Sequence, residues 1–197
     1  MSHFDNRAQN WDKGNTQVDG ARVIADAIRA KIALNSSMEI IDFGTGTGLL
    51  GFDVATSVKQ VHGIDTSAKM LEKLEEKNSD TLQIITYKQD IIKTPLKQKF
   101  DGLVSSMTLH HIEDLEVFFT TIYNTLQKDA FIAIADLESE DGTFHSDNNG
   151  VFHFGFNKDT LSNVVKRCGF KNIMFKKINT IHKPHRDFGV FLLTASK

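Results

Sequence analysis

The stretch IIDFGTGTGLLG at residues 40–51 contains the glycines and the acid best suited to hold a ligand. Counted from Gly44 it reads GxGxG directly after an acid, and counted from Gly46 it reads GxGxxG. Glycines let the backbone approach a ligand closely and adopt positive φ. Because GxGxxG is the dinucleotide fingerprint, the glycines alone suit a nicotinamide dinucleotide or another ligand with an adenosine end.

Two acids near these glycines bear on the choice between the ligands. Asp65 ends the next apolar run, about twenty residues further on, where it can accept hydrogen bonds from ribose hydroxyls in either case. Asp42 separates the two interpretations, because a carboxylate at the mouth of the loop repels a pyrophosphate and attracts an amine or a sulfonium. S-adenosylmethionine carries both cationic groups and has no phosphate. The acid followed by glycines therefore favours S-adenosylmethionine.

Histidines gather in two places where a general base would be wanted. His110 and His111 follow a predicted strand at 100–105, and His145 and His153 lie in a late polar segment. Imidazole exchanges protons near neutral pH, so His110, His145 and His153 are candidate bases or acceptor contacts. Imidazoles also bind zinc, but no HxxxH or CxxC spacing is present, and no metal is expected. The other histidines are expected at the surface: His3, His62, His182 and His185.

Helical and strand patterns alternate along the chain and position these residues. Short apolar runs predict buried strands at 38–43, 60–65, 82–87, 100–105 and 130–135. Amphipathic spacing predicts helices at 18–34, 48–58 and 67–77, and two more that begin after the capping residues Asp114 and Asn157. Two strand-like segments, 171–178 and 188–195, end the chain, with a turn of about ten residues between them.

Five β-α units with a hairpin-like end predict an α/β fold, with a mostly parallel sheet and helices on both faces. The 197 residues fit a single domain over 1–197. Ligands of such sheets bind beyond the carboxyl ends of the strands, so the site is expected around residues 42–48. A net charge of −2, one cysteine and no long apolar run or leader favour a cytoplasmic protein without a nucleic-acid or membrane partner.

Four stretches, "IIDFGTGTG", "VHGIDTSAKML", "YKQDI" and "FDGLVSSMTLHHI", follow one another in the chain. With them, and with the opening "FDNRAQNWDK", the chain resembles the class I S-adenosylmethionine-dependent methyltransferases over essentially its whole length. It is most similar to the small-molecule type found in ubiquinone and menaquinone biosynthesis. The resemblance implies a Rossmann-like sheet of seven strands with the last one antiparallel, S-adenosyl-L-methionine as cofactor, S-adenosyl-L-homocysteine as product and a small-molecule methyl acceptor.

The resemblance also implies roles for individual residues. Asp42 and the glycines would surround the methionine portion, Asp65 would bind the ribose, and Asp90 would accept from the adenine amino group. Ser105 and Ser106 would border the sulfonium. The full expected cofactor-binding set is Trp11, Asp42, Gly44, Thr45, Gly46, Gly48, Asp65, Thr66, Met70, Asp90, Ile91, Ser105 and Ser106.

Two segments are expected to close the site. Residues 1–20 form an N-terminal cap, in which the indole of Trp11 marks a place where the segment docks. Residues 137–156 form a polar substrate lid after the fifth strand. Its phenylalanines are candidates to line an apolar acceptor pocket. Three charged residues are candidate acceptor contacts: Asp136 and Glu138 for a cationic acceptor, and Arg186 for an acidic one.

The predicted reaction is transfer of a methyl group from S-adenosylmethionine to a small molecule by in-line displacement. A base is needed only if the attacking atom loses a proton. Two alternatives stay open at this point. One is a non-catalytic protein that binds S-adenosylmethionine or S-adenosylhomocysteine. The other is a nicotinamide-dependent oxidoreductase, which Asp42 and the lack of a Tyr-x-x-x-Lys pair disfavour. The sequence identifies neither the acceptor nor the oligomeric state.

Overall fold

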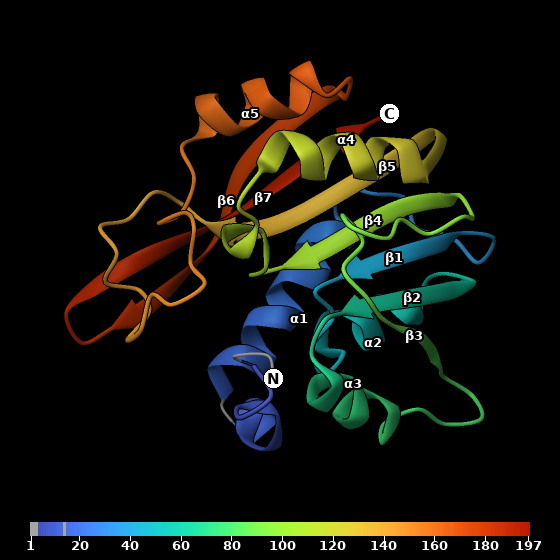
Figure 1. The fold of residues 1–197 in the computed structure, drawn as a ribbon, viewed down its shortest axis with the longest axis horizontal. Helices are drawn as coiled ribbons and strands as arrows, with labels where there is room; N and C mark the ends of the chain where they lie inside the picture. The colour runs from blue at the N-terminus through green and yellow to red at the C-terminus, as the bar shows by residue number, and fades with distance from the viewer. Residues whose placement is uncertain (1–3, 14) are drawn as a thin grey trace.

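A computed structural model describes residues 4–13 and 15–197 of the chain. The strands in these ranges are β1 (Glu39–Phe43), β2 (Gln60–Asp65), β3 (Ile84–Lys88), β4 (Phe100–Ser106), β5 (Leu126–Leu137), β6 (Lys171–Lys183) and β7 (Arg186–Ser196). The helices are α1 (Asn15–Arg29), α2 (Leu49–Ala55), α3 (Ala68–Glu75), α4 (Leu115–Thr125) and α5 (Lys158–Arg167), with short 3-10 helices η1 (Ala8–Lys13) and η2 (Leu109–His111). Figure 1 shows the helices packed around one twisted sheet.

The strands form one sheet in the order β3-β2-β1-β4-β5-β7-β6. Neighbouring strands from β3 to β5 run parallel, and β7 runs antiparallel to both β5 and β6. The predicted fold, a mostly parallel seven-stranded sheet whose last strand is antiparallel, is therefore confirmed. β1 has β2 on one side and β4 on the other, so the strand order reverses there and a ligand site is expected at its carboxyl end.

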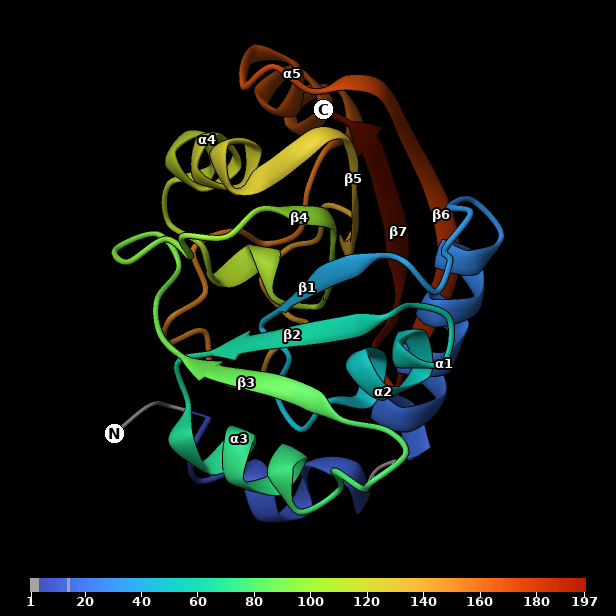
Figure 2. The same ribbon diagram turned by 90° about the vertical axis from the view of Figure 1, so that its right-hand side faces the viewer.

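Helices cover both faces of the sheet, as expected for parallel strands. Successive residues of a strand point to opposite faces, and Ile40 and Ile41 of β1 show the consequence. Ile40 belongs to the apolar cluster that α1, α2 and α3 complete, and Ile41 belongs to the cluster that α4 and α5 complete. Figure 2 shows the same division, with α4 and α5 beside β4 and β5 and the other three helices on the opposite side.

Three helices begin at polar capping residues, of which Asp114 and Asn157 are the predicted ones. The side chain of Ser67 accepts a hydrogen bond from Met70 N at the start of α3. Asp114 does the same for Val117 N in α4, and Asn157 does so for the first turn of α5. Each cap satisfies a backbone N–H that the helix itself leaves without a partner.

The C-terminal hairpin is longer than the sequence pattern predicts. β6 extends to Lys183 and β7 begins at Arg186, so the expected turn of about ten residues is wrong and two residues make the connection. The outer part of β6 lacks an apolar run, because Asn179, Ile181 and Lys183 point into a cavity instead of the core. Because this mixture of polar and apolar side chains forms no apolar run, the sequence pattern does not predict the outer part of the strand.

The histidines expected at the surface divide into two groups. His182 and His185 are exposed, whereas His62 is buried in β2, so its predicted surface position is wrong. Its ring stacks on Tyr87, and burial lowers its pKa. The reason is that β2 lies inside the parallel sheet, where both faces are covered. His3 lies outside the described residues.

Candidate active site

A cavity of about 820 Å³ opens at the carboxyl ends of the parallel strands. Its walls come from the N-terminal segment and α1, the loops after β1, β2, β3 and β4, the segment 144–152 and the outer end of β6. This volume is within the usual range for ligand sites. The cavity lies where the reversal of strand order predicts it.

The glycine loop after β1 forms one wall of the cavity. Gly44 and Gly46 have φ values of 65° and 55°, a region that favours glycine. A Cβ at Gly44 would lie 2.3 Å from Thr108 Cγ2, whereas a Cβ at Gly46 would meet no atom within 4 Å. Because Gly46 lines the cavity, that open space is space for a ligand. Gly48 does not line the cavity, which corrects its expected place; it caps α2, where a Cβ would crowd Phe52.

Asp42 reaches the cavity from the end of β1, although only 1% of its surface is exposed. Its Oδ2 accepts a hydrogen bond of 2.6 Å from Thr45 Oγ1. Burial raises the pKa of Asp42 to about 7, against the lowering effect of Thr45. No cation pairs with this carboxylate among the described residues. A positively charged ligand would stabilise its ionised form.

Asp65 ties two loops of the cavity wall together. Its Oδ2 accepts from Gly46 N at 2.9 Å and its Oδ1 accepts from Ser67 N at 2.8 Å. Burial raises the pKa of Asp65 as well. Each carboxylate oxygen has a second lone pair, so Asp65 can still accept from hydroxyl groups of a ligand.

The far end of this wall follows β3. Asp90 lines the cavity there, together with Thr66 and Met70. Asp90 Oδ1 accepts from Ile92 N at 3.0 Å, and its Oδ2 lies 3.2 Å from Lys93 Nζ. Ile92 contributes to the wall, which corrects the expected role of Ile91.

Two expected wall residues are core residues instead. Ile91 is fully buried in the apolar cluster under α4, because the turn after β3 directs it inward. Ser105 is 1% exposed, and its Oγ donates to Phe43 O at 2.8 Å between two parallel strands. Its neighbour Ser106 does line the cavity, at the end of β4. The sequence places the serines correctly along the chain, but only one of the pair reaches the ligand space.

A chain of three polar residues leads to the opposite wall. His110 is 1% exposed, and its Nδ1 donates to Asp136 Oδ1 over 2.7 Å. The backbone N–H of His110 donates to Asp136 Oδ2 at 3.1 Å. On the other side of the ring, His110 Nε2 lies 3.2 Å from His145 Nε2. Both histidines line the cavity, so the carboxylate, the first imidazole and the second imidazole lead to it in that order.

The remaining predicted contacts lie away from the cavity. His153 Nε2 donates to Ile112 O at 2.9 Å and its ring packs on Phe156, which corrects its expected catalytic place. Asp136 faces His110 and not an acceptor. Glu138 lies 4.0 Å from Lys177, and Arg186 is paired with an acid of the 138–157 loop. These polar groups already have partners within the protein.

The described part of the N-terminal segment crosses the cofactor side of the cavity. Asp12 Oδ1 accepts from Thr47 Oγ1 at 2.6 Å, and its Oδ2 lies 2.6 Å from Lys77 Nζ. Asp5 Oδ1 accepts from Ser67 Oγ at 2.6 Å. Trp11 lines the cavity between these contacts. The segment is thus held across the loops that follow β1 and β2.

A model of a methyltransferase domain family matches residues 41–134. An uncharacterised methyltransferase of Schizosaccharomyces pombe is 30% identical over 155 residues, which are 70% of this chain and 55% of that protein. Residues 41–134 therefore match a methyltransferase domain, and the chain is similar in sequence and fold to class I S-adenosylmethionine-dependent methyltransferases. These matches argue against the oxidoreductase interpretation of the GxGxxG pattern.

Other relatives agree with the methyltransferase family. An O-methyltransferase of Aspergillus nomiae is 29% identical over 71% of this chain and 67% of its own. The structure of an S-adenosylmethionine-dependent methyltransferase from Mesorhizobium loti has a TM-score of 0.73 at 22% identity, over 91% of this chain and 100% of that one, and shares the fold. The chain spans about half the length of the first curated relatives it matches.

The cavity fits S-adenosylmethionine. The open space at Gly46 gives room for a ligand against the backbone. The buried carboxylates of Asp42 and Asp65 suit a ligand with cationic groups and ribose hydroxyls. Asp90 offers an acceptor at the far end of the same wall.

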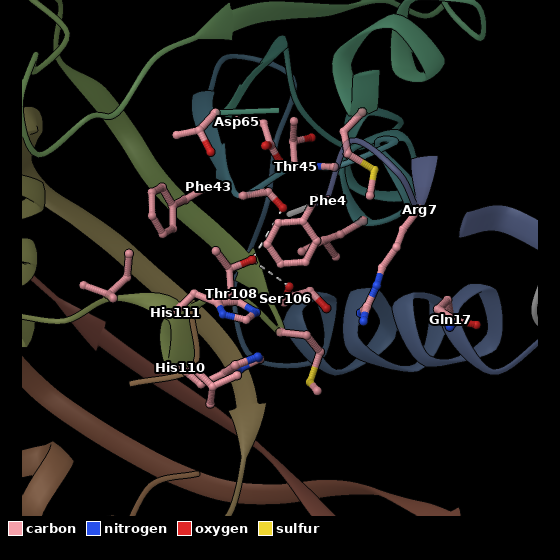
Figure 3. A pocket seen from close by; sticks show the side chains of 18 of the residues that line it. Phe4, Arg7, Gln17, Phe43, Thr45, Asp65, Ser106, Thr108, His110 and His111 are labelled. Atoms are coloured by element: carbon pink, nitrogen blue, oxygen red, sulfur yellow. Dashed lines mark hydrogen bonds between the residues drawn. The ribbon is translucent and has the colours of Figure 1, made fainter. Parts of the chain in front are cut away.

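Several wall residues were not among the predicted site residues. Phe4, Arg7 and Gln17 enter from the N-terminal region, and Thr108 and His111 enter from the loop after β4 (Figure 3). Of the lid phenylalanines, Phe144 and Phe152 line the cavity and Phe154 and Phe156 do not. These residues are far apart in the chain and follow no periodic pattern.

Among the described residues, no helix is long and apolar enough to span a bilayer.

Proposed function

We propose that this chain transfers the methyl group of S-adenosylmethionine to a hydroxyl group of a small molecule by in-line displacement, with His145 as the general base. The observation that carries the proposal is the Asp136–His110–His145 chain, which opens into the same cavity as Asp42, Gly46 and Asp65. One wall suits the methyl donor, and the opposite wall offers a path for a proton.

The hydrogen-bond chain determines which nitrogen of His145 acts. Because the Asp136 carboxylate accepts, His110 Nδ1 carries a proton and its Nε2 can accept from His145 Nε2–H. The Nδ1 of His145 is then the basic atom. When it takes a proton, His145 Nε2–H can pass to His110, whose positive charge Asp136 stabilises.

This relay makes up for the weakness of His145 as an isolated base. Burial, followed by nearby positive charges, lowers the pKa of His145 to about 4. Transfer of the proton to His110 moves the positive charge next to the buried Asp136 carboxylate. We infer that Asp136 is a positioning residue, because it orients His110 and does not touch the cavity.

With S-adenosylmethionine bound, these residues account for every bond and proton in the methyl transfer. Bound S-adenosylmethionine supplies a methyl group that its sulfonium already activates. The acceptor oxygen forms the bond to the methyl carbon, the carbon–sulfur bond breaks with its electrons on sulfur, and the hydroxyl proton goes to His145 Nδ1. The N-terminal segment and the lid, 137–156, exclude water from the reacting groups.

An oxygen acceptor is favoured by two observations. A hydroxyl must lose its proton as it attacks, so a base with a relay is useful, whereas a thiolate needs none. One relative, that of Aspergillus nomiae, is named an O-methyltransferase. We therefore assign the small-molecule acceptor a hydroxyl group as its nucleophile.

Calorimetric titration with S-adenosylmethionine, S-adenosylhomocysteine and NAD tests the cofactor part of the proposal. We expect the first two ligands to bind and NAD not to bind, because Asp42 disfavours a pyrophosphate. Binding of NAD alone would contradict the proposal. Release of S-adenosylhomocysteine with a panel of hydroxylated small molecules then tests catalysis, and its absence across phenols and alcohols would favour a non-catalytic binding protein.

A further inference from the structure

Arg7 brings a positive charge into the cavity from the N-terminal segment. Its side chain lines the cavity, and Figure 3 shows it extending from that segment toward α1. Within residues 4–13 and 15–197, its guanidinium has no hydrogen bond or ion pair. An arginine fork offers five N–H donors in a planar arrangement suited to a carboxylate.

Lys183 brings a second positive charge from the outer end of β6. Its Nζ donates to Phe144 O and lies 4.1 Å from the centre of the Phe144 ring. Burial lowers the pKa of Lys183, although the charge of Glu140 opposes this effect. Glu140 does not line the cavity; its carboxylate accepts from backbone N–H groups of the 138–157 loop. The ammonium keeps further N–H donors for a ligand.

Both charges act on the candidate base. The side chains whose electrostatic effect lowers the pKa of His145 come from the loop after β4, from β6 and from the N-terminal segment, and no carboxylate is among them. They are the imidazoles of His110 and His111 and the cations of Lys183 and Arg7. Lys183 and Arg7 therefore place positive charge next to His145.

The acids of the cavity lie on the cofactor wall or at exposed positions. Asp42, Asp65 and Asp90 belong to the cofactor wall, where Lys93 pairs with Asp90. The other three are exposed residues on the wall, Glu113, Asp114 and Asp147, of which Asp114 caps α4 and Asp147 accepts from a backbone N–H. A negative ligand beside His145 thus meets two cations.

We propose that the methyl acceptor carries an anionic group, a carboxylate in the simplest case, which Arg7 and Lys183 bind beside His145. This inference rests on the proposed function, because it assigns the class of acceptor at the same site. The apolar side chains of Phe4, Phe144 and Ile181 line the same space. The acceptor is therefore a hydroxylated acid with an apolar body.

An anionic acceptor also improves the base that it needs. A carboxylate on Arg7 and Lys183 offsets the positive charges that disfavour protonation of His145. The base then strengthens when acceptor is present and is weak without it. Binding of the acceptor and activation of its hydroxyl are coupled through the same two side chains.

Trp11 allows a direct test of the anion site. It is the one tryptophan in the chain and it lines the cavity, so its fluorescence reports binding there. Protein saturated with S-adenosylhomocysteine is titrated with benzoate, benzamide and benzylamine, and calorimetry repeats each titration. We expect benzoate to bind about tenfold or more tighter than the other two, since charge-assisted hydrogen bonds reach only the anion.

Variants show which residues are responsible. Arg7→Gln combined with Lys183→Gln should remove the preference for benzoate, and Arg7→Lys should keep part of it. Arg22→Gln combined with Lys176→Gln is the matched control, because it removes two exposed charges outside the cavity and should keep the preference.

Each outcome decides the proposal. Benzoate that binds no tighter than benzamide, a preference that survives the Arg7 and Lys183 changes, or a preference lost in the control would overturn the anion site. If S-adenosylhomocysteine itself fails to bind, the proposed function fails as well. Binding of S-adenosylhomocysteine without a benzoate preference overturns the anion site alone.

Discussion

The two sides of the cavity differ in charge and in the way the chain builds them. The cofactor side consists of loops that directly follow β1, β2 and β3, and it presents the acids Asp42, Asp65 and Asp90. The opposite side draws on the N-terminal segment, η2, the lid and β6, and it presents histidines and cations.

The proposed reaction and anion site would explain this difference by two ligands of opposite charge in one cavity. Buried carboxylates favour the sulfonium and ammonium groups of the methyl donor, and positive charges favour an anionic acceptor. Each side repels the ligand that belongs to the other, so the charges orient both ligands before any specific contact forms. Substitutions on the two sides should therefore have separate effects on cofactor binding and on catalysis.

Removal of the base should affect catalysis and spare the cofactor side. His145→Ala is expected to lower turnover roughly 10²–10⁴-fold, because the acceptor hydroxyl loses its proton carrier. S-adenosylmethionine affinity by calorimetry should stay within about twofold, since the cofactor wall is unchanged. His182→Ala, an exposed histidine outside the cavity, is the control. Unaltered turnover in His145→Ala would reduce this histidine to a structural role.

Removal of a cofactor acid should have the opposite pattern. Asp65→Ala is expected to weaken S-adenosylmethionine binding by about 1–3 kcal/mol, because ribose hydroxyls lose their acceptor. Asp80→Ala removes an exposed acid outside the cavity and should leave affinity unchanged. If a folded Asp65→Ala variant binds normally, Asp65 has no contact with the cofactor.

Substitution of two glycines in the same loop should separate an effect on ligand affinity from an effect on folding stability. Gly46→Ala places a methyl in open cavity space and should weaken S-adenosylmethionine binding about tenfold, with a backbone cost of about 1–2 kcal/mol at its positive φ. Gly44→Ala places a methyl 2.3 Å from Thr108 and should lower the melting temperature further. Equal melting temperatures for the two variants would contradict this assignment.

Titration of Asp42, on the cofactor side, should make the free energy of unfolding depend on pH. Its folded pKa of about 7 lies above the unfolded value of 3.8, so the folded state keeps a proton that the unfolded state has lost between these values. Stability should therefore fall as pH rises through this window. Asp42→Asn should reduce that fall by about 1 kcal/mol or more, measured by urea unfolding at pH 5 and pH 8.

The change in stability with pH that Asp42 contributes is opposite in sign to the one that His145 contributes. The folded pKa of His145, about 4, lies below its unfolded value of 6.5, so this group increases stability as pH rises between them. His145 is present in both proteins, and its contribution cancels in the comparison. An Asp42→Asn variant with the same pH profile as the parent chain would show that Asp42 is ionised in the folded state across this range.

The sequence predicted the frame of the fold well, for physical reasons. Strands such as β2, found at the predicted residues 60–65, are short apolar runs because both faces of a parallel sheet are buried. The helix caps Asp114 and Asn157 were predictable because capping depends on residues close in sequence. The outer half of β6 was missed, since its side chains face a cavity of mixed polarity.

The residues of the candidate site likewise divide into those that the sequence predicted and those that it did not. The carboxyl end of β1 brings Asp42 and the glycines to the cavity directly, so a local motif was sufficient. The partner of His110 lies 26 residues further along the chain, and Asp136 was expected to face an acceptor instead. Arg7 and Lys183 come from opposite ends of the sequence, and only the folded sheet brings both to one histidine.

The N-terminal segment would also affect the turnover of the proposed reaction. The contacts from Asp5 to Ser67 and from Asp12 to Thr47 and Lys77 hold this segment across the loops that would grip the cofactor. In the proposed reaction, spent cofactor leaves and fresh cofactor enters once per cycle, and each exchange requires these contacts to open. Opening of residues 4–13 is therefore expected to set an upper bound on turnover in the proposed reaction.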